Sequence, residues 1–380
     1  MADAQPGQKP LSGRLASIDA LRGFDMFWII GARSIVDGLR DLRFPGAGVL
    51  ANQLTHSGWN GFTFYDLIFP LFVFIVGVSL VFAIRKRIER GEARAAIFRR
   101  VVWRSVLLFA LGVFYNGGVS ESPMAENLRV MGVLQRIALV YFFASVLVLT
   151  TSVRTQAASV AAILVGYWLA MRFVPVPGYG AGVWTPWGNL ARYVDMHLLP
   201  GKPYWDTWDP EGILSTVPAV ATGLLGVLTG HWLRAKRGPR GRALTAEARA
   251  GYLFLAGVLG VALGLLAGLV FPINKNLWTS SFVLLTGGLS AAALAAFYWI
   301  IDIRGFKKWA FPFVVIGLNS IAIYLGVEII PFDDIARRLL GGDISALFGP
   351  GQAIFEAAVQ LALEWLVLLW LYRRKIFIRL

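Results

Sequence analysis

Ten segments of this 380-residue chain are apolar over lengths that suit a crossing of a lipid bilayer. They cover approximately residues 24–39, 67–84, 101–116, 130–150, 157–174, 213–232, 250–271, 278–301, 310–330 and 353–372. Hydrophobic residues make up 57% of the chain and charged residues only 15%, whereas a soluble domain is about half apolar and a quarter charged. The sequence therefore predicts an all-α polytopic membrane protein with about ten transmembrane helices.

The distribution of basic residues indicates how the chain is threaded. Most of the 36 Lys and Arg residues fall near both ends and in alternate connections such as 85–100 and 234–249. Because cytoplasmic loops carry the excess of positive charge, we expect both termini inside. Residues 1–13 are then a disordered cytoplasmic leader without a cleavable signal peptide, residues 14–380 a single transmembrane domain, and residues 172–212 a long outer loop.

Charge and composition also narrow the partners. The net charge of +14 fits the topology signal and contact with anionic membrane lipids, which argues against a nucleic-acid partner. The absence of cysteine excludes disulfides and thiolate chemistry. With only three scattered histidines, we expect no metal site.

A polar stretch, residues 54–66, leads into the second apolar segment. It holds His56, Trp59, Asn60 and Asp66. A neutral imidazole takes up a proton near pH 7, so this group is a candidate site for acyl or proton transfer. The same residues also suit an interfacial loop in which Trp59 is a membrane-surface anchor and His56 is merely solvated.

The outer loop is rich in tryptophan and ends in DTWDPEG. Because sugar C–H faces stack on aromatic rings and sugar hydroxyls pair with carboxylates, Trp208, Asp209 and Glu211 are candidates for sugar binding. The tryptophans would serve equally as interfacial anchors. His197 in this loop and His231 at the end of the sixth segment are alternatives to His56, although a plain loop position and an interfacial position explain them as well.

Polar side chains also lie in other segments. Arg104 begins the third, Arg129 lies at the edge of the fourth, and Arg136 lies about two turns deeper. A buried guanidinium requires a carboxylate or a phosphate. The ninth segment places Asn319 and Glu328 at helical spacing, where hydrogen bonding between helices is the alternative explanation.

Six sequence blocks carry a resemblance to a known family. They are RLASIDALRG (14–23), HSGWNGFTFYDLIFPLFVFIVGVS (56–79), RVMGVLQRIALVY (129–141), DTWDPEGILSTVPAV (206–220), FPINKNLWTSSFV (271–283) and GLNSIAIYLG (317–326). In this order they resemble the heparan-α-glucosaminide N-acetyltransferase family, which includes a lysosomal enzyme and bacterial NagX-like relatives. The resemblance implies a homodimeric acyltransferase in a bacterial inner membrane. Such an enzyme would move an acetyl group from cytosolic acetyl-CoA, a co-substrate, to an amino sugar on the periplasmic side.

The resemblance also implies roles for individual residues. The family's catalytic histidine corresponds to His56 and its neighbouring aspartate to Asp66, while its NKN block corresponds to Asn274, Lys275 and Asn276. The lysosomal enzyme uses a second catalytic asparagine near the end of its first span, but here that region reads IIGARSIVDG. Either Asn52, Asn60 or Asp37 takes the role of this asparagine, or the acceptor chemistry differs.

Two mechanisms remain open at the sequence level. His56 could act as a general base, with Asp66 orienting its imidazole and with Asn60 or a backbone N–H stabilising the oxyanion. Alternatively, His56 is first acetylated and then deacylated by the sugar. Arginines and one asparagine would bind the donor or line its path: Arg22, Arg85, Arg104, Arg129, Arg136 and Asn319.

Other functions stay open as well. A cell-envelope O-acyltransferase would use the same histidine with a hydroxyl acceptor. A secondary sugar transporter would use intramembrane charges as ion relays; these are Asp25, Asp37, Arg136, Glu328 and Glu364. A scaffold or lipid-binding protein without turnover is the third alternative.

Overall fold

The structure is a computed structural model that describes residues 15–42, 45–117, 128–205, 207–238, 241 and 243–378. These residues form helices and no β-strand, which confirms the all-α prediction. In chain order the helices are α1 (Ala16–Asp41), α2 (Ala47–Gln53), α3 (Phe64–Glu89), α4 (Arg94–Tyr115), α5 (Val133–Thr150), α6 (Val153–Phe173), α7 (Leu190–Leu198), α8 (Ile213–Arg234), α9 (Ala246–Gly268), α10 (Ser280–Phe297), the π-helix η3 (Tyr298–Ile303), α11 (Phe311–Leu318), α12 (Ser320–Ile329), α13 (Phe332–Leu340), α14 (Asp343–Ala346), the 3-10 helix η4 (Gly349–Gly351) and α15 (Gln352–Arg373).

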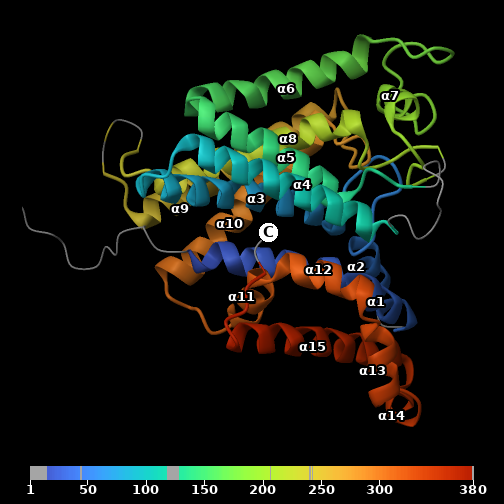
Figure 1. Ribbon diagram of the computed structural model, residues 1–380. Helices are drawn as coiled ribbons and strands as arrows, with labels where there is room; N and C mark the ends of the chain where they lie inside the picture. The colour runs from blue at the N-terminus through green and yellow to red at the C-terminus, as the bar shows by residue number, and fades with distance from the viewer. Residues whose placement is uncertain are drawn as a thin grey trace, which may run out of the picture.

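The helices pack in layers (Figure 1). Helices α3, α4, α5 and α8 lie together, with α6 outside them and α9 and α10 beside them. Helix α1 packs against α3 on one side and against α11 and α15 on the other. The last described residues return to the middle of the molecule, where Ile376 and Ile378 lie against Asn319 (Figure 1).

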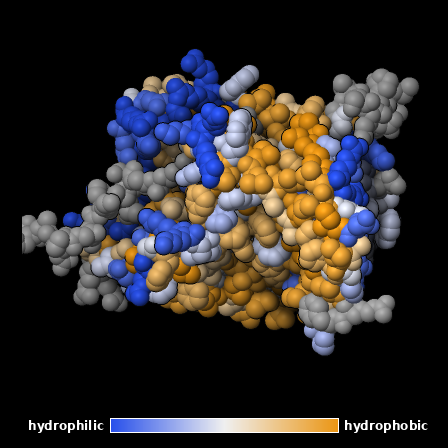
Figure 2. Space-filling model, turned by 90° about the horizontal axis from the view of Figure 1, so that it is seen from below, coloured by the Kyte–Doolittle hydropathy of each residue, from blue (hydrophilic) through white to orange (hydrophobic). Residues whose placement is uncertain are grey.

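Seven of the described helices are long and apolar enough to cross a membrane. They are α3, α5, α6, α8, α9, α10 with η3, and α15 with η4. Figure 2 shows the matching surface, a broad apolar band with hydrophilic residues gathered toward its ends. Helices α1 and α4, which hold two of the ten expected segments, are not among the seven. The expected segment 310–330 is the bent pair α11 and α12, which adds an eighth only if the pair counts as one span. Ten spans and both termini inside therefore stay predictions.

Glycine residues allow the backbones of α3 and α8 to pack directly against each other. A Cβ atom on Gly77 of α3 would lie 1.9 Å from the carbonyl oxygen of Gly223, and one on Gly226 would lie 2.0 Å from that of Phe74. Small residues let helix backbones approach this closely in membrane proteins. The contact sets the spacing between α3 and α8. Their first turns hold Asp66 and Ser215, which belong to the site described below.

The structure corrects the expectation of an unbroken ninth helix over 310–330. The chain bends by 74° between α11 and α12, at Asn319. The side-chain amide of Asn319 bonds the chain's last described residues instead of a neighbouring helix: its Nδ2 donates to the Ile376 carbonyl (3.1 Å), and its Oδ1 accepts from the Ile378 N–H (2.8 Å).

Other differences concern the connections. The expected outer loop 172–212 contains α7, and α13 and α14 occupy the connection before α15, where no helix was expected. The expected leader, residues 1–13, lies outside the described residues.

Candidate active site

His56 and Asp66 meet at the start of α3. His56 lies in the connection between α2 and α3, and its Nδ1 is 2.8 Å from Oδ1 of Asp66. The other carboxylate oxygen of Asp66 accepts hydrogen bonds from the N–H groups of Ser57 (3.2 Å) and Thr63 (3.0 Å), and the Thr63 hydroxyl lies 3.1 Å from it. Asp66 is fully buried, and the two N–H groups orient its carboxylate toward the imidazole.

A second loop brings Lys275 to the other side of the same ring. Its Nζ is 2.8 Å from Nε2 of His56 and 3.2 Å from Nδ1. A carboxylate beside Nδ1 requires a proton on that nitrogen, which leaves the lone pair on Nε2. The ammonium of Lys275 is close to both ring nitrogens, so it lies over the ring and beside the nitrogen that a general base would use.

The two loops are joined by hydrogen bonds. Nδ2 of Asn274 donates to Oδ1 of Asn60 (3.0 Å), and the Gly61 N–H donates to the Ile273 carbonyl (2.9 Å). Asn274 is completely buried, and its Oδ1 accepts from the Leu277 N–H, so the turn that presents Lys275 is fixed from within. Asn276 follows on this turn and is partly buried.

The surroundings keep His56 neutral. Burial lowers its pKa, although 46% of its side-chain surface is exposed, and the Lys275 cation lowers the pKa further. The hydrogen bond to Asp66 and the charge of Glu211 act in the opposite direction. Burial also lowers the pKa of Lys275. A base with an accessible lone pair and an easily neutralised amine thus lie side by side.

Aromatic residues frame this pair. The ring of Tyr65 lies 4.6 Å from that of His56. Trp59 donates its indole N–H to the Trp184 carbonyl (2.7 Å) and meets Trp208 edge to face at 5.2 Å. The structure thus brings two tryptophans of the 172–212 connection next to the His56 stretch.

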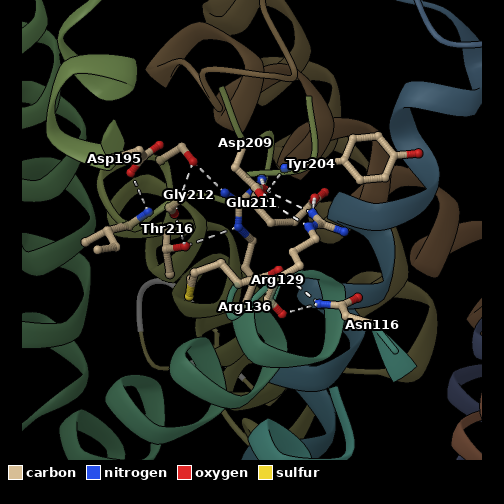
Figure 3. Close-up of polar contacts among 12 residues, drawn as sticks. Asn116, Arg129, Arg136, Asp195, Tyr204, Asp209, Glu211, Gly212 and Thr216 are labelled. Atoms are coloured by element: carbon tan, nitrogen blue, oxygen red, sulfur yellow. Dashed lines mark hydrogen bonds and ion pairs between the residues drawn. The ribbon is translucent and has the colours of Figure 1, made fainter. Parts of the chain in front are cut away.

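Arg129 joins the end of that connection to the segment before α5 (Figure 3). Its guanidinium forms two hydrogen bonds of 3.0 Å with Asp209 and one of 2.7 Å with Glu211. Its position is fixed by Asn116, which donates to the Arg129 carbonyl, and by the ring of Tyr204, 4.5 Å away. Burial opposes the charge of Arg129, but the two carboxylates raise its pKa above the ordinary value.

Arg136 lies completely buried one turn into α5. It donates to Thr216 (3.3 Å) and Ser215 in the first turn of α8, and its guanidinium lies 4.7 Å from the ring centre of Trp278. Its Nη1 has no hydrogen-bond partner among the described residues. Asp195 of α7 fixes the same helix start by accepting from the Ile213 N–H (2.8 Å). Burial raises the pKa of Asp195 to about 7.

A cavity of about 390 Å³ opens farther along α3, and we call it the Arg104 pocket. Its volume is within the usual range for small-molecule sites. Four basic residues line it, Arg22, Lys86, Arg104 and Arg234. Two acidic residues line it as well: Asp19 pairs with Arg22, and Glu89 pairs with Arg234. Nε of Arg104 is buried without a hydrogen-bond partner among the described residues, so this donor is available to an anion.

A small apolar void of about 20 Å³ adjoins the Arg104 pocket. It shares Phe72, Ile137 and Ile321 with that pocket, and Phe69 and Tyr324 also line it. The ring of Phe69 packs 5.2 Å from that of Trp278, beside Arg136. Phe69 therefore lies between the void and the residues around Arg136.

The residues expected to bind the donor fall into two groups. Arg22 and Arg104 line the pocket, but Arg129 and Arg136 lie with Asp209, Glu211 and the start of α8. Asn319 is occupied by the chain's last described residues, of which Ile378 lines the pocket, and Arg85 is not among the lining residues.

The histidines other than His56 lie elsewhere. His197 is exposed on α7 and bonds the Tyr193 carbonyl, and His231 lies near the end of α8. Among the proposed substitutes for the missing asparagine, Asn60 contacts the Lys275 loop, whereas Asn52 is exposed on α2 and Asp37 on α1.

Sequence reasoning missed several contributors. Lys86 and Arg234 counted only as topology charges, yet both line the Arg104 pocket. Thr63 was also missed, although Thr followed three residues later by Asp is a helix-start pattern. No cluster of three or more potential metal ligands occurs among the residues that the structure describes.

Known proteins are similar in sequence to this chain. A family model described as "Heparan-alpha-glucosaminide N-acetyltransferase, catalytic" matches residues 14–262. The chain is 29% identical to heparan-alpha-glucosaminide N-acetyltransferase of Homo sapiens, over 86% of this chain and 55% of the relative. It is 28% identical to the Mus musculus protein of the same name, over 87% of this chain and 56% of the relative. The chain thus spans about half the length of these relatives. It belongs to the heparan-alpha-glucosaminide N-acetyltransferase family, and the match covers the part that the family model describes as catalytic.

Proposed function

We propose that this protein transfers an acetyl group from cytosolic acetyl-CoA, held in the Arg104 pocket, to an amino sugar at His56 on the other side of a bacterial inner membrane. One observation carries the proposal: a pocket with four basic residues and a histidine–aspartate pair lie toward opposite ends of α3. Twenty residues of helix separate Asp66 from Lys86, a rise of about 30 Å, which matches the thickness of a bilayer's hydrocarbon core.

The Arg104 pocket suits the donor's charged end. Arg22, Lys86 and Arg104 would hold phosphates of CoA, since guanidinium and ammonium groups bind phosphate by charge-assisted hydrogen bonds. The pantetheine arm would follow the apolar void past Phe72 toward Phe69. Arg136, with an unpartnered nitrogen beside Trp278, would meet the end of that arm.

His56 would act as the base. Asp66 fixes the imidazole with its lone pair on Nε2, and burial keeps it neutral, so it can take a proton from the acceptor as the acceptor attacks the thioester carbonyl. Asn60 has its amide oxygen occupied by Asn274, which orients its NH₂ group as a candidate donor to the oxyanion. The same lone pair would also suit an acetyl-histidine intermediate.

The acceptor would enter between the two tryptophans and the acidic residues. Trp59 and Trp208 provide adjoining aromatic surfaces, and the charge of Glu211 acts on both His56 and Lys275. A carboxylate in this position favours an acceptor that carries an amine, so we favour N-acetylation over O-acetylation as the reaction. Residues 14–380 would act as one transmembrane domain in contact with lipids, and we propose a homodimer from the family resemblance.

Acetyl transfer by purified protein is the direct test. Labelled acetyl-CoA would be supplied with glucosamine or N-acetylglucosamine to wild type, His56→Ala and His197→Ala, the last replacing an exposed histidine outside the site. Labelled product is expected from wild type and His197→Ala, with a loss of at least 10²-fold in His56→Ala. Full activity in His56→Ala would refute both histidine mechanisms.

The two acceptors separate the rival functions. Label on glucosamine alone supports N-acetylation, and equal label on N-acetylglucosamine, which offers only hydroxyls, supports the O-acyltransferase. Sugar uptake into liposomes without any dependence on acetyl-CoA would overturn the proposal in favour of a transporter.

A further inference from the structure

Lys275 occupies the position that a reacting amine must take. Its Nζ lies 2.8 Å from Nε2 of His56, within the heavy-atom distance expected between a general base and the proton that it removes. Asp66 holds the far side of the same ring at 2.8 Å. The arrangement of carboxylate, imidazole and primary amine is the one that the acceptor sugar would have to reproduce.

We propose that Lys275 is an internal acceptor, whose ε-amino group the protein acetylates when donor is bound and no sugar is present. This inference rests on the proposed function, since it uses the same donor and the same base. It adds a covalent modification site. It also adds a form of self-inhibition, because an acetylated Lys275 would fill the acceptor position and stop turnover.

The reaction needs no additional reagent. The neutral ε-amine attacks the thioester carbonyl of acetyl-CoA, the C–N bond forms, and the C–S bond breaks. His56 takes the proton that the nitrogen loses, and this proton leaves with the CoA thiolate as the free thiol. The product is N-acetyl-lysine, a neutral amide that can no longer take part in transfer.

The charges around Lys275 agree with this role. Burial lowers the pKa of Lys275 and so increases the fraction of reactive free amine. The titratable groups that face the pair are Asp66 on α3, Glu211 before α8, Tyr65 in the first turn of α3, and Arg136 on α5. Lys275 is close to both ring nitrogens of His56, at 2.8 and 3.2 Å.

An amine acceptor would compete with this side reaction. An incoming ammonium group would take the place of Nζ beside His56 and would share the negative potential of Glu211. Lys275 would then be displaced, and saturation with sugar should protect it. Sugar acetylation and self-acetylation therefore respond to acceptor concentration in opposite directions.

Peptide mass spectrometry tests the inference without a variant. Purified protein is incubated with acetyl-CoA, with and without glucosamine, and acetyl occupancy is measured at Lys275 and at Lys202, an exposed lysine of the connection between α7 and α8. We expect occupancy at Lys275 at least tenfold above Lys202, and strong suppression by glucosamine. The mark should survive hydroxylamine, which removes acetyl from histidine but not from lysine.

Two variants sharpen the result. His56→Ala should abolish the excess at Lys275 and leave Lys202 unchanged, while Lys275→Arg should remove the hydroxylamine-stable label at this peptide. If glucosamine is acetylated but Lys275 is marked no more than Lys202, the inference is wrong and the proposed function stands. If neither glucosamine nor Lys275 is acetylated, both fail.

Discussion

At the scale of single residues, the chemistry depends on which nitrogen of His56 holds the proton. Asp66 at 2.8 Å from Nδ1 fixes this, and the buried carboxylate has its second oxygen occupied by Ser57 and Thr63. The imidazole therefore cannot rotate or exchange its proton without breaking a network of hydrogen bonds. Nζ of Lys275 lies 2.8 Å from Nε2 of the same ring, so the three side chains form one connected group.

Replacing Lys275 by Met should shift the pH dependence of transfer. In the proposed mechanism transfer needs neutral His56, so kcat/KM should rise with pH through the pKa of His56, which burial and Lys275 lower from its ordinary value. Removing the Lys275 cation raises that pKa, and the acidic limb should move to higher pH by roughly one unit, the size expected for a nearby charge. The measurement is kcat/KM for glucosamine from pH 5 to 9.

The matched control is Lys202→Met, which removes an exposed lysine that is not among the groups that shift the pKa of His56 and should leave the profile unchanged. The titration of glucosamine itself is common to all three proteins and cancels in the comparison. An acidic limb that stays in place or moves to lower pH in Lys275→Met would refute the electrostatic coupling.

The sequence could predict one half of this unit but not the other. His56 and Asp66 are ten residues apart across a helix start, so local geometry alone makes their contact plausible. Lys275 is 219 residues from His56, and only the packing of α10 against α3 and α8 brings its loop there. The family resemblance pointed to the NKN block, but the nitrogen that Lys275 contacts required the structure.

At the scale of elements, the start of α3 is both a helix cap and part of the site. The Thr63 hydroxyl donates to the Thr55 carbonyl (2.6 Å) and contacts the carboxylate of Asp66 (3.1 Å). Thr63→Val keeps the shape of the side chain and removes these bonds. We expect a loss of about 1 kcal/mol in stability, and a fall in kcat because Asp66 and His56 lose their alignment.

Ser152→Ala is the control for this prediction. Ser152 caps α6 by accepting from the Thr155 N–H (3.2 Å), away from His56. Its loss should also cost about 1 kcal/mol but leave kcat unchanged. Thermal unfolding followed by tryptophan fluorescence, together with the acetylation rate, measures both effects. Equal losses of activity in the two variants would mean that Thr63 contributes only stability.

The contact between α3 and α8 gives a second prediction at this scale. A Cβ atom on Gly226 would lie 2.0 Å from the carbonyl oxygen of Phe74, so Gly226→Ala must push the helices apart. Overpacking of this kind typically costs about 1–3 kcal/mol. Gly251→Ala on α9 meets no atom within 4 Å and should be neutral or stabilising. Thermal unfolding in detergent compares them, and equal midpoints would refute the close contact.

Hydropathy predicted most of the helices but not their irregularities. Apolar runs fix where a chain can cross a membrane, and every expected segment falls wholly or largely within a helix or a helix pair. The bend at Asn319 depends instead on the return of residues 376–378, because this asparagine's amide bonds their backbone. A contact between segments nearly 60 residues apart leaves no local pattern in either of them.

At the scale of the whole molecule, the proposed function requires two regions to cooperate across the length of α3. The Arg104 pocket and His56 share no residue, and the proposed path of the donor's arm passes apolar side chains such as Phe72 and Met26. Phosphates cannot enter such a passage cheaply, because burying an unpaired charge costs several kcal/mol. The donor's nucleotide should therefore stay in the pocket while only its uncharged arm advances.

Arg104→Met tests this division of labour. If Arg104 holds a phosphate, its loss should raise the KM for acetyl-CoA about tenfold, since a hydrogen bond to a charged group is worth about 1.5–3 kcal/mol. The KM for acetyl-pantetheine, which lacks the nucleotide and its phosphates, should not change, and kcat should stay close to that of wild type because His56 is untouched. Arg99→Met, on the exposed side of α4, is the matched control and should behave as wild type with both donors. An equal rise in KM for both donors would show that Arg104 supports the fold of the pocket rather than the binding of phosphate.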